Sequence, residues 1–242
     1  MSFKLYITED YNKFNDINYY NNYKEYIEII DVTKTDYNKE NIFYLHTFLN
    51  EFTTLYYVWK NNLYSDYVGF CHYHKLLNLD IIIPLIGVNK FDYFKCDNSS
   101  GFKAVFFNIL NISSIKNKFE KYLFDYDPKL FNIYKEKHDK VNGRSLFITR
   151  YENFIKLVEF LYNFILYIFE NKNLSVLSFI QFINTEIKNN INISFDNNYV
   201  VYDYLNKNIY RLIGFFIEYM CGLYIEYDII INKKTSIYIN RL

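Results

Sequence analysis

Asp66-Tyr-Val-Gly-Phe-Cys-His-Tyr-His-Lys75 changes within ten residues from an apolar run to a dense set of titratable side chains. The apolar part, residues 67–71, has the pattern of a buried strand. The polar part follows directly, so residues 72–75 should emerge at the carboxyl end of that strand. Because open α/β sheets bind ligands outside the carboxyl ends of their strands, this stretch predicts a buried sheet and a binding site at its edge.

Strand and helix patterns alternate on either side of this stretch. Short strands are predicted at three further places, which are residues 3–8, 26–31 and 79–84. Residues 47–59 carry apolar side chains at helical spacing, from Phe48 to Trp59, and predict an amphipathic helix. Lys60-Asn61-Asn62 is typical of a helix end, because it supplies a cation and residues that tolerate left-handed geometry.

Helical patterns dominate the second half of the chain. Helices are predicted at residues 115–123, 151–170, 175–188 and 206–225, with one strand at residues 143–149. The last apolar segments, around Asn232-Lys-Lys, predict a terminal hairpin over residues 227–240. Only two prolines and six glycines are present, so no flexible linker is indicated. We expect one layered α/β domain over residues 1–242.

Composition excludes several classes of function. Lys and Arg together number 27 and Asp and Glu also number 27, so the bulk charge indicates no nucleic-acid partner. Aromatic residues make up 22%, and an AT-rich genome explains that excess more simply than a base-stacking surface does. No Gly-rich dinucleotide or P-loop fingerprint and no nucleophile elbow occur, which leaves oxidoreductase, NTPase and serine-hydrolase functions without support.

The chain has the features of a protein of the cytoplasm. Its three cysteines, Cys71, Cys96 and Cys221, have no paired spacing, which disfavours a disulfide framework and a structural zinc site. The N-terminus turns acidic where a secretory signal would continue apolar. The most apolar segment, residues 154–169, is interrupted by a polar stripe at helical spacing, so it is not a bilayer span. A peripheral contact at the inner face of a membrane stays open.

The first candidate for chemistry is the polar strand end itself. His72 and His74 share one face of the strand, and Tyr73 and Lys75 share the other. A zinc site would need further ligands, and the other histidines have no diagnostic spacing. The alternatives are a hydrogen-bonding role for His72 with Lys75 near a diphosphate, or a polar strand end without function.

A second candidate is Asp125-Tyr-Asp127, which follows Tyr122-Leu-Phe124. An Asp-x-Asp pair at a strand end can hold a divalent cation that bridges a nucleotide diphosphate, or serve a metal-dependent hydrolase. Pro128 fits a turn equally well, so both interpretations stay open.

Glu218 is the third candidate, because it lies inside an apolar stretch, residues 212–221. Burial of a carboxylate costs free energy unless the group is paired or used. Arg211 precedes it by about two helical turns on the same face, with Gly214 between them where another backbone or a ligand can approach closely. Glu218 is therefore either the partner of Arg211 or a general base at an acceptor hydroxyl.

Four segments occur in an order that points to one family. They are residues 51–61, residues 66–73, Asn142-Gly-Arg-Ser-Leu-Phe-Ile148 and Arg211-Leu-Ile-Gly-Phe-Phe-Ile-Glu218. Together they resemble the domain-of-unknown-function 4422 family, found among capsular and exopolysaccharide biosynthesis proteins, over roughly residues 40 to 225. The resemblance implies a GT-A-like, Rossmann-like mixed sheet flanked by helices, with a helix-rich C-terminal half.

The resemblance also implies an activity. A glycosyltransferase would move a sugar from a nucleotide diphosphate donor, with a UDP-sugar as the expected donor, to a hydroxyl of a glycan acceptor. It implies Glu218 and His72 as catalytic residues, and these donor-binding residues: Tyr6, Thr8, Asp66, Tyr73, His74, Lys75 and Arg211. A requirement for Mn²⁺ or Mg²⁺ stays open. The family usually has two arginines where His74 and Lys75 stand, so the alternative is a non-catalytic glycan-binding or assembly protein that keeps the fold.

Overall fold

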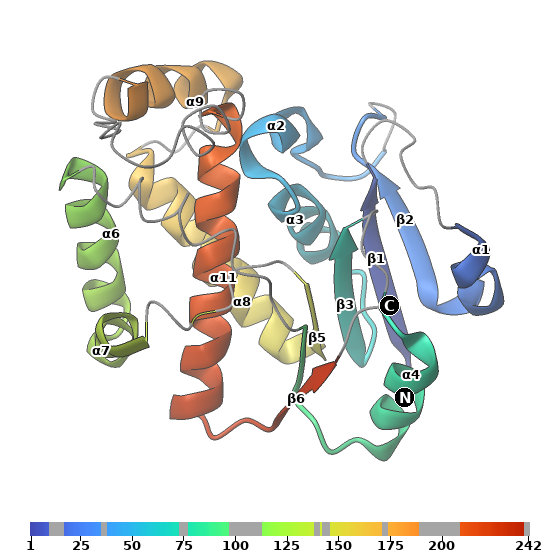
Figure 1. The fold of residues 1–242 in the computed structure, drawn as a ribbon. Coiled ribbons are helices and arrows are strands. Elements are labelled where there is room, and N and C mark those ends of the chain that lie inside the picture. Colours follow the sequence, from blue (N-terminus) through green and yellow to red (C-terminus); the bar gives the residue numbers. More distant parts are fainter. Residues whose placement is uncertain are drawn as a thin grey trace, which may run out of the picture.

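A mixed sheet runs through the centre of the molecule, with helices on both faces (Figure 1). The structure is a computed structural model that describes residues 1–9, 17–34, 38–72, 77–96, 113–137, 141, 146–170, 174–188 and 209–239. Six strands of this part of the chain form the sheet: β1 (Phe3–Glu9), β2 (Ile27–Asp31), β3 (Tyr67–His72), β4 (Tyr93–Cys96), β5 (Phe147–Arg150) and β6 (Ser236–Ile239).

The strand order is β2-β1-β3-β5-β4-β6. The strands β1, β2 and β3 are parallel, β5 is antiparallel to both of its neighbours, and β6 is parallel to β4. All strands except β5 therefore point the same way, so β1, β2 and β3 end at the same edge of the sheet.

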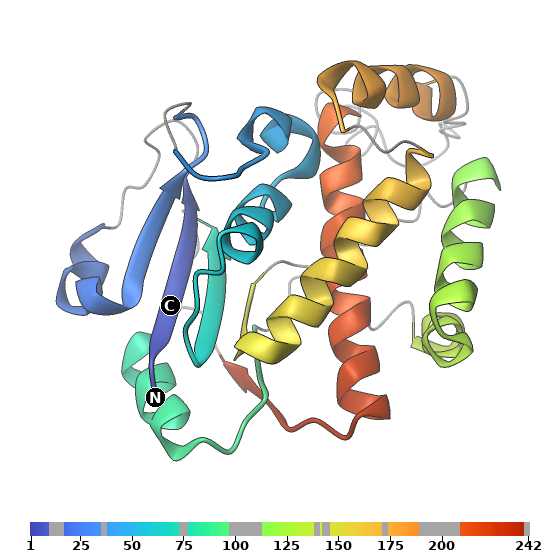
Figure 2. The same ribbon diagram turned by 180° about the vertical axis from the view of Figure 1, so that it is seen from behind.

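One face of the sheet is covered by α1 (Ile17–Tyr20), η1 (Asn21–Tyr26) and α4 (Leu79–Val88). The opposite face is covered by α3 (Phe52–Lys60), α8 (Tyr151–Ile168) and α11 (Leu212–Ile231). Figure 2 shows this second face, with α8 crossing it diagonally. The remaining helices pack mainly around this layer: η2 (Phe43–Leu45), α2 (His46–Leu49), α6 (Ser113–Tyr126), α7 (Pro128–Lys137), α9 (Val176–Phe182), the π-helical η3 (Ile183–Lys188) and η4 (Ile209–Arg211).

Side chains alternate between the two faces of the sheet along a strand, so a strand contributes to the hydrophobic core on each face. In β1, Leu5 and Ile7 belong to the core under α4, whereas Tyr6 belongs to the core under α3 and α8. This two-residue period is the geometry of an extended chain with both faces buried. The predicted strands at residues 3–8, 26–31 and 67–71 and the predicted helices at residues 115–123, 151–170 and 175–188 are confirmed.

Three predictions about elements are wrong. The helix predicted over residues 47–59 is two helices, α2 and α3, because Asn50 has φ 48° and ψ −135° and interrupts the helical path. Residues 79–84 are not a strand but the first part of α4. The terminal hairpin does not form, since α11 continues to Ile231 and β6 pairs with β4 in parallel.

Candidate functional site

Three strand ends define the edge where a ligand is expected. Thr8 of β1 is in register with His72 of β3, and Glu9 is in register with Asp31 of β2. The connection from β1 to β2 passes through α1 and η1 on one face of the sheet, and the connection from β2 to β3 passes through α2 and α3 on the other. The carboxyl ends of β1 and β3 therefore form a topological switch point, where open α/β sheets hold their ligands.

A cavity of about 330 Å³ opens beside this edge and is lined in part by α2, the helix labelled in Figure 1. Its walls come from the segment after β2, from η2 and α2, and from the residue that precedes α11. The lining residues are Val32, Thr33, Phe43, His46, Thr47, Asn50 and Arg211. The walls combine two apolar side chains with hydroxyl groups, an imidazole, an amide and a guanidinium, which suits an amphipathic anionic ligand.

Asn50 links the α2 side of the cavity to the side that Arg211 forms. Its Oδ1 accepts a hydrogen bond from Arg211 Nε at 3.1 Å, and its Nδ2 donates to Glu218 Oε1 at 3.3 Å. Asn50 is 1% exposed and Glu218 is 7% exposed. Arg211, which ends η4, and Glu218 of α11 both contact Asn50, so they lie on one side as predicted, but a third side chain links them.

Gly214 makes this arrangement possible. A Cβ atom at Gly214 would lie 2.5 Å from Asn50 Cγ, which is far inside van der Waals contact. The sequence predicted a close approach at this glycine, and the group that approaches is the Asn50 side chain.

The wall formed by the segment after β2 is held by Asp31. Its Oδ1 accepts from the Thr33 hydroxyl at 2.6 Å and from the Thr33 N–H at 3.0 Å. Burial would raise the pKa of Asp31, but these hydrogen bonds and the nearby Lys34 charge outweigh it and lower the pKa below its ordinary value of 3.8. Asp31 is therefore anionic at neutral pH and orients Thr33 at the cavity.

The structure brings only some of the predicted site residues together. Arg211 lines the cavity, and the backbone of His72 lies at the same sheet edge. Thr8 also lies near this edge, but its side chain is buried and its hydroxyl donates to Thr54 Oγ1 at 2.9 Å. The predictions for Tyr73, His74 and Lys75 lie outside the described residues, and they stay predictions.

Two predicted donor-binding residues lie away from the cavity. Tyr6 is buried in the core, stacks on Phe70 and donates to the Leu63 carbonyl at 3.3 Å. Asp66 precedes β3 at the opposite edge of the sheet, where it accepts hydrogen bonds from Ser2 N at 2.6 Å and Tyr64 OH at 2.8 Å. The Tyr6 hydroxyl is engaged inside the core, and Asp66 is separated from the His72 edge by the length of β3, roughly 20 Å, so neither residue is placed to contact a ligand beside His72.

The Asp-x-Asp pair does not fit a metal site at a strand end, because α6 extends to Tyr126. Asp125 Oδ2 accepts from Lys121 Nζ at 2.6 Å, and Asp127 caps α7 by accepting from Lys129 N at 2.8 Å. Asp127 also accepts from Tyr227 OH at 2.7 Å. Across the described residues, no group of three or more His, Cys, Asp or Glu side chains is arranged to hold a metal ion.

Of the lining residues, sequence reasoning named only Arg211 and missed the other six, which are Val32, Thr33, Phe43, His46, Thr47 and Asn50. The available signal for Asn50 is that asparagine tolerates positive φ better than most residues, although Asn50 lies inside the single helical pattern over residues 47–59. Phe43 and His46 gave no such signal, because an aromatic residue and a histidine in a connecting segment have no diagnostic spacing.

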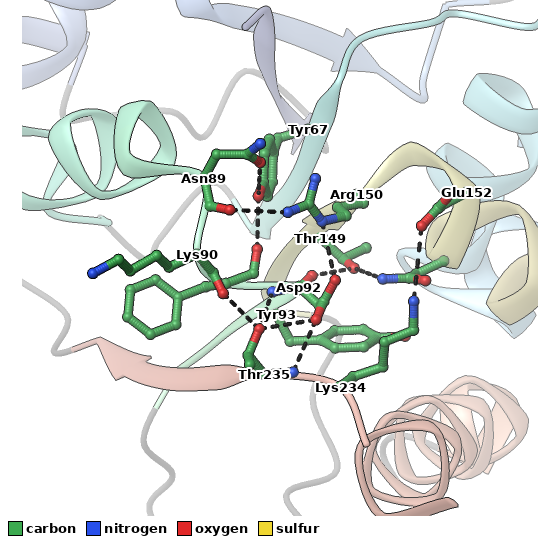
Figure 3. Close-up of polar contacts among 12 residues, drawn as sticks. Tyr67, Asn89, Lys90, Asp92, Tyr93, Thr149, Arg150, Glu152, Lys234 and Thr235 are labelled. Atoms are coloured by element: carbon green, nitrogen blue, oxygen red, sulfur yellow. Dashed lines mark hydrogen bonds and ion pairs between the residues drawn. The ribbon is translucent and has the colours of Figure 1, made fainter. Parts of the chain in front are cut away.

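A second polar cavity, of about 380 Å³, lies at the opposite edge of the sheet and includes Tyr64, Asp66, Arg150 and Glu152. Figure 3 shows the network beside it, in which Arg150 Nε donates to Asp92 Oδ1 at 3.0 Å and an Arg150 terminal nitrogen donates to the Asn89 carbonyl at 3.2 Å. These contacts tie the end of β5 to the residue before β4 and to the end of α4, so Arg150 has a structural role that needs no ligand.

The mixed six-stranded sheet flanked by helices is similar to a solved glycosyltransferase structure, as expected for a GT-A-like fold. One solved structure that the chain resembles is the apo structure of the bifunctional glycosyltransferase WbbM, with a TM-score of 0.61 and 17% identity. The match covers 100% of this chain and 45% of that chain, so this chain spans less than half the length of the protein it resembles.

No family model matches the sequence, and no curated protein matches it. The resemblance to the domain-of-unknown-function 4422 family therefore stays a prediction. In the part of the chain that the structure describes, no helix has both the length and the apolar character to cross a bilayer.

Proposed function

We propose that the protein is a glycosyltransferase that moves a sugar from a nucleotide diphosphate donor, a UDP-sugar, to a hydroxyl of a glycan acceptor in polysaccharide or glycoconjugate synthesis. The observation that carries this proposal is the cavity beside the carboxyl end of β2, with Arg211 in its wall, in a fold like that of a solved glycosyltransferase. Fold alone does not determine activity, so the argument depends on the chemistry of this wall.

Arg211 supplies the charge that such a reaction needs. When the sugar leaves, negative charge grows on the diphosphate, and a guanidinium stabilises it through paired hydrogen bonds. Arg211 Nε already donates to Asn50, so the terminal nitrogens are the donors that can turn to a phosphate. Its guanidinium carbon also lies 5.6 Å from the centre of the Phe215 ring, which restricts its orientation.

The rest of the cavity suits a nucleoside. Phe43 and Val32 provide apolar surface for a base, and Thr33, Thr47 and His46 provide groups that can hydrogen-bond ribose or sugar hydroxyls. His46 Nδ1 lies 3.0 Å from Thr53 Oγ1, so the ring is oriented from the side of α3.

On the acceptor side we propose His72. Its backbone closes β3 beside Thr8, at the switch point where the acceptor would approach the donor sugar. An imidazole can take a proton from a hydroxyl near neutral pH, which is the step that an inverting transfer requires.

Nucleotide binding tests the proposal first. The melting temperature would be measured with UDP, GDP, dTDP and UDP-sugars, each with manganese and with a chelator. UDP at 100 times its Kd should stabilise the protein by about 2.7 kcal/mol, which corresponds to a rise of about 5 to 10 °C for a domain of this size. Arg211→Ala should lose this rise, whereas Lys129→Ala, which removes an exposed cation on α7, should keep it.

Transfer is tested separately from binding. His72→Ala should keep the UDP shift and lose at least about 100-fold in turnover, as expected for removal of a group that transfers a proton. Absence of any nucleotide shift would contradict the proposed function. Binding of a glycan without binding of any nucleotide would instead support the non-catalytic alternative.

A further inference from the structure

Asn50 has a backbone conformation that only glycine adopts easily. Its φ of 48° and ψ of −135° lie outside the left-handed helical region where asparagine is common. Such strain persists only when the surroundings hold it, and it concentrates at functional sites. Here the Asn50 N–H donates to the His46 carbonyl at 2.9 Å, and the Asn50 carbonyl accepts from Thr53 Oγ1 at 3.0 Å.

The strained backbone places the Asn50 carboxamide between Arg211 and Glu218, two charged groups that need opposite hydrogen-bond partners. Arg211 requires an acceptor and Glu218 requires a donor, and the carboxamide offers one of each. An aspartate would place a second carboxylate beside Glu218, and an apolar side chain would leave both groups without this partner. The need for one donor and one acceptor explains why a residue other than glycine occupies a glycine-like conformation.

Glu218 lies behind this amide. Asn50 and Arg211 line the cavity, whereas Glu218 contacts Asn50 from the side of α11 and is not among the lining residues that the structure describes. A general base must come within hydrogen-bond reach of the acceptor hydroxyl. The geometry is better suited to a carboxylate that acts through its neighbour.

We propose that Asn50 is a positioning residue that aims Arg211 at the donor diphosphate, and that Glu218 orients Asn50 rather than acting as the general base. This inference rests on the proposed function, because it assigns Arg211 to the diphosphate. Glu218 Oε1 fixes the amide through Nδ2, and the amide oxygen then holds Arg211 Nε, so the terminal guanidinium nitrogens face the cavity.

Three variants separate these roles by UDP affinity, measured by calorimetry, and by turnover. Asn50→Gly keeps a residue suited to this backbone and removes both hydrogen bonds, so the Kd for UDP should rise about tenfold, which is 1.4 kcal/mol. Glu218→Ala removes the acceptor that orients Asn50 and should weaken UDP binding to a similar extent. Glu218→Gln keeps a carbonyl oxygen for Asn50 Nδ2, so its Kd should rise only about threefold.

Asn62→Gly is the matched control. Asn62 also has φ 48° but is exposed after α3, away from the cavity. This substitution should leave UDP affinity and turnover unchanged. Asn50→Ala should bind UDP as weakly as Asn50→Gly but melt at a lower temperature, because alanine carries the backbone strain that glycine avoids.

Each outcome decides a different point. A loss of about 100-fold or more in turnover for Glu218→Gln, at unchanged UDP affinity, would identify a general base and overturn the positioning role of Glu218 while the glycosyltransferase proposal stands. Wild-type UDP affinity in Asn50→Gly would overturn the role of Asn50 in the same way. A parent protein that binds no nucleotide would overturn the proposed function, and this inference with it.

Discussion

Gly69 occupies the centre of β3 with almost no free space around it. A Cβ atom there would lie 2.7 Å from Ile148 Cγ1 of β5 and 2.9 Å from Leu5 Cδ1 of β1. We expect Gly69→Ala to lower the free energy of unfolding by about 1 to 3 kcal/mol, because both neighbours belong to a packed core. Urea denaturation measures this change.

Gly87 provides the matched control for that substitution. It lies in α4, and a Cβ atom there would have no neighbour within 4 Å. Gly87→Ala should stabilise the protein by about 0.5 to 1 kcal/mol, because alanine loses less backbone entropy in a helix. Equal stability of the two variants would show that β3 is not packed as described.

Asn50 illustrates, at the scale of single residues, what the sequence alone does not predict. Arg211 and Glu218 were recognised from their spacing on one predicted helix, because helical geometry relates residues within one segment. Asn50 lies 161 residues from Arg211 in the sequence, and no local pattern relates the two. Its role became visible only with the packing of α2 against α11.

Among the elements, α4 shows why a local pattern can mislead. Leu79-Asp-Ile-Ile-Ile-Pro has the β-branched composition of a strand, yet it begins a helix. Asn78 caps the first turn by accepting from Ile81 N at 3.4 Å, and Asn89 ends the helix with φ 55°. Asparagine favours both of these helix-terminal positions, but the prediction followed only the apolar, β-branched run between them.

At the sheet edge that carries the second cavity, Asp92 connects three strands. Its carboxylate accepts from Arg150 Nε at 3.0 Å and from the Thr235 N–H and hydroxyl, each at 2.9 Å, which joins β4, β5 and β6 (Figure 3). Burial would raise the pKa of Asp92, but the hydrogen bonds from Thr235, with the Lys234 charge and Arg150, lower the pKa below its ordinary value of 3.8. The folded state therefore favours the charged carboxylate.

We predict that Asp92→Asn lowers the free energy of unfolding by about 2 kcal/mol at pH 7, since hydrogen bonds to a charged group are lost. A carboxyl group whose pKa is lowered on folding stabilises the protein above its unfolded pKa, and this contribution disappears as the pH falls through the folded value. The difference between variant and parent should therefore shrink as the pH falls below 3.8.

Asp125→Asn is the control for Asp92→Asn. Asp125 is exposed and its ion pair with Lys121 lies on the surface of α6. Its substitution should change stability by less than about 0.5 kcal/mol at every pH. Denaturation curves between pH 2.5 and 7 compare the two, and parallel curves for Asp92→Asn and the parent protein would contradict the assigned contacts.

At the scale of the whole molecule, the sequence predicted the fold class and the sheet edge but not the cavity. Apolar residues recur with different patterns in buried strands and in amphipathic helices, so the α/β class follows from local patterns. The cavity requires residues 32–33 and 43–50 to lie beside Arg211 at the start of α11, and that arrangement depends on how α2, α3 and α11 pack. Patterns within one segment carry no information about such packing.

Hydrogen exchange with and without UDP tests this arrangement across the whole chain. A ligand slows exchange most where opening requires its release, by an amount that reaches about 2.7 kcal/mol at 100 times the Kd. We expect new protection in two segments far apart in sequence, residues 42–50 and 209–214, and its loss in Arg211→Ala. The second cavity, with Tyr64 and Arg150 in its wall, should show no comparable change. Protection confined to that opposite edge would move the donor site there and overturn the assignment of Arg211 to the diphosphate.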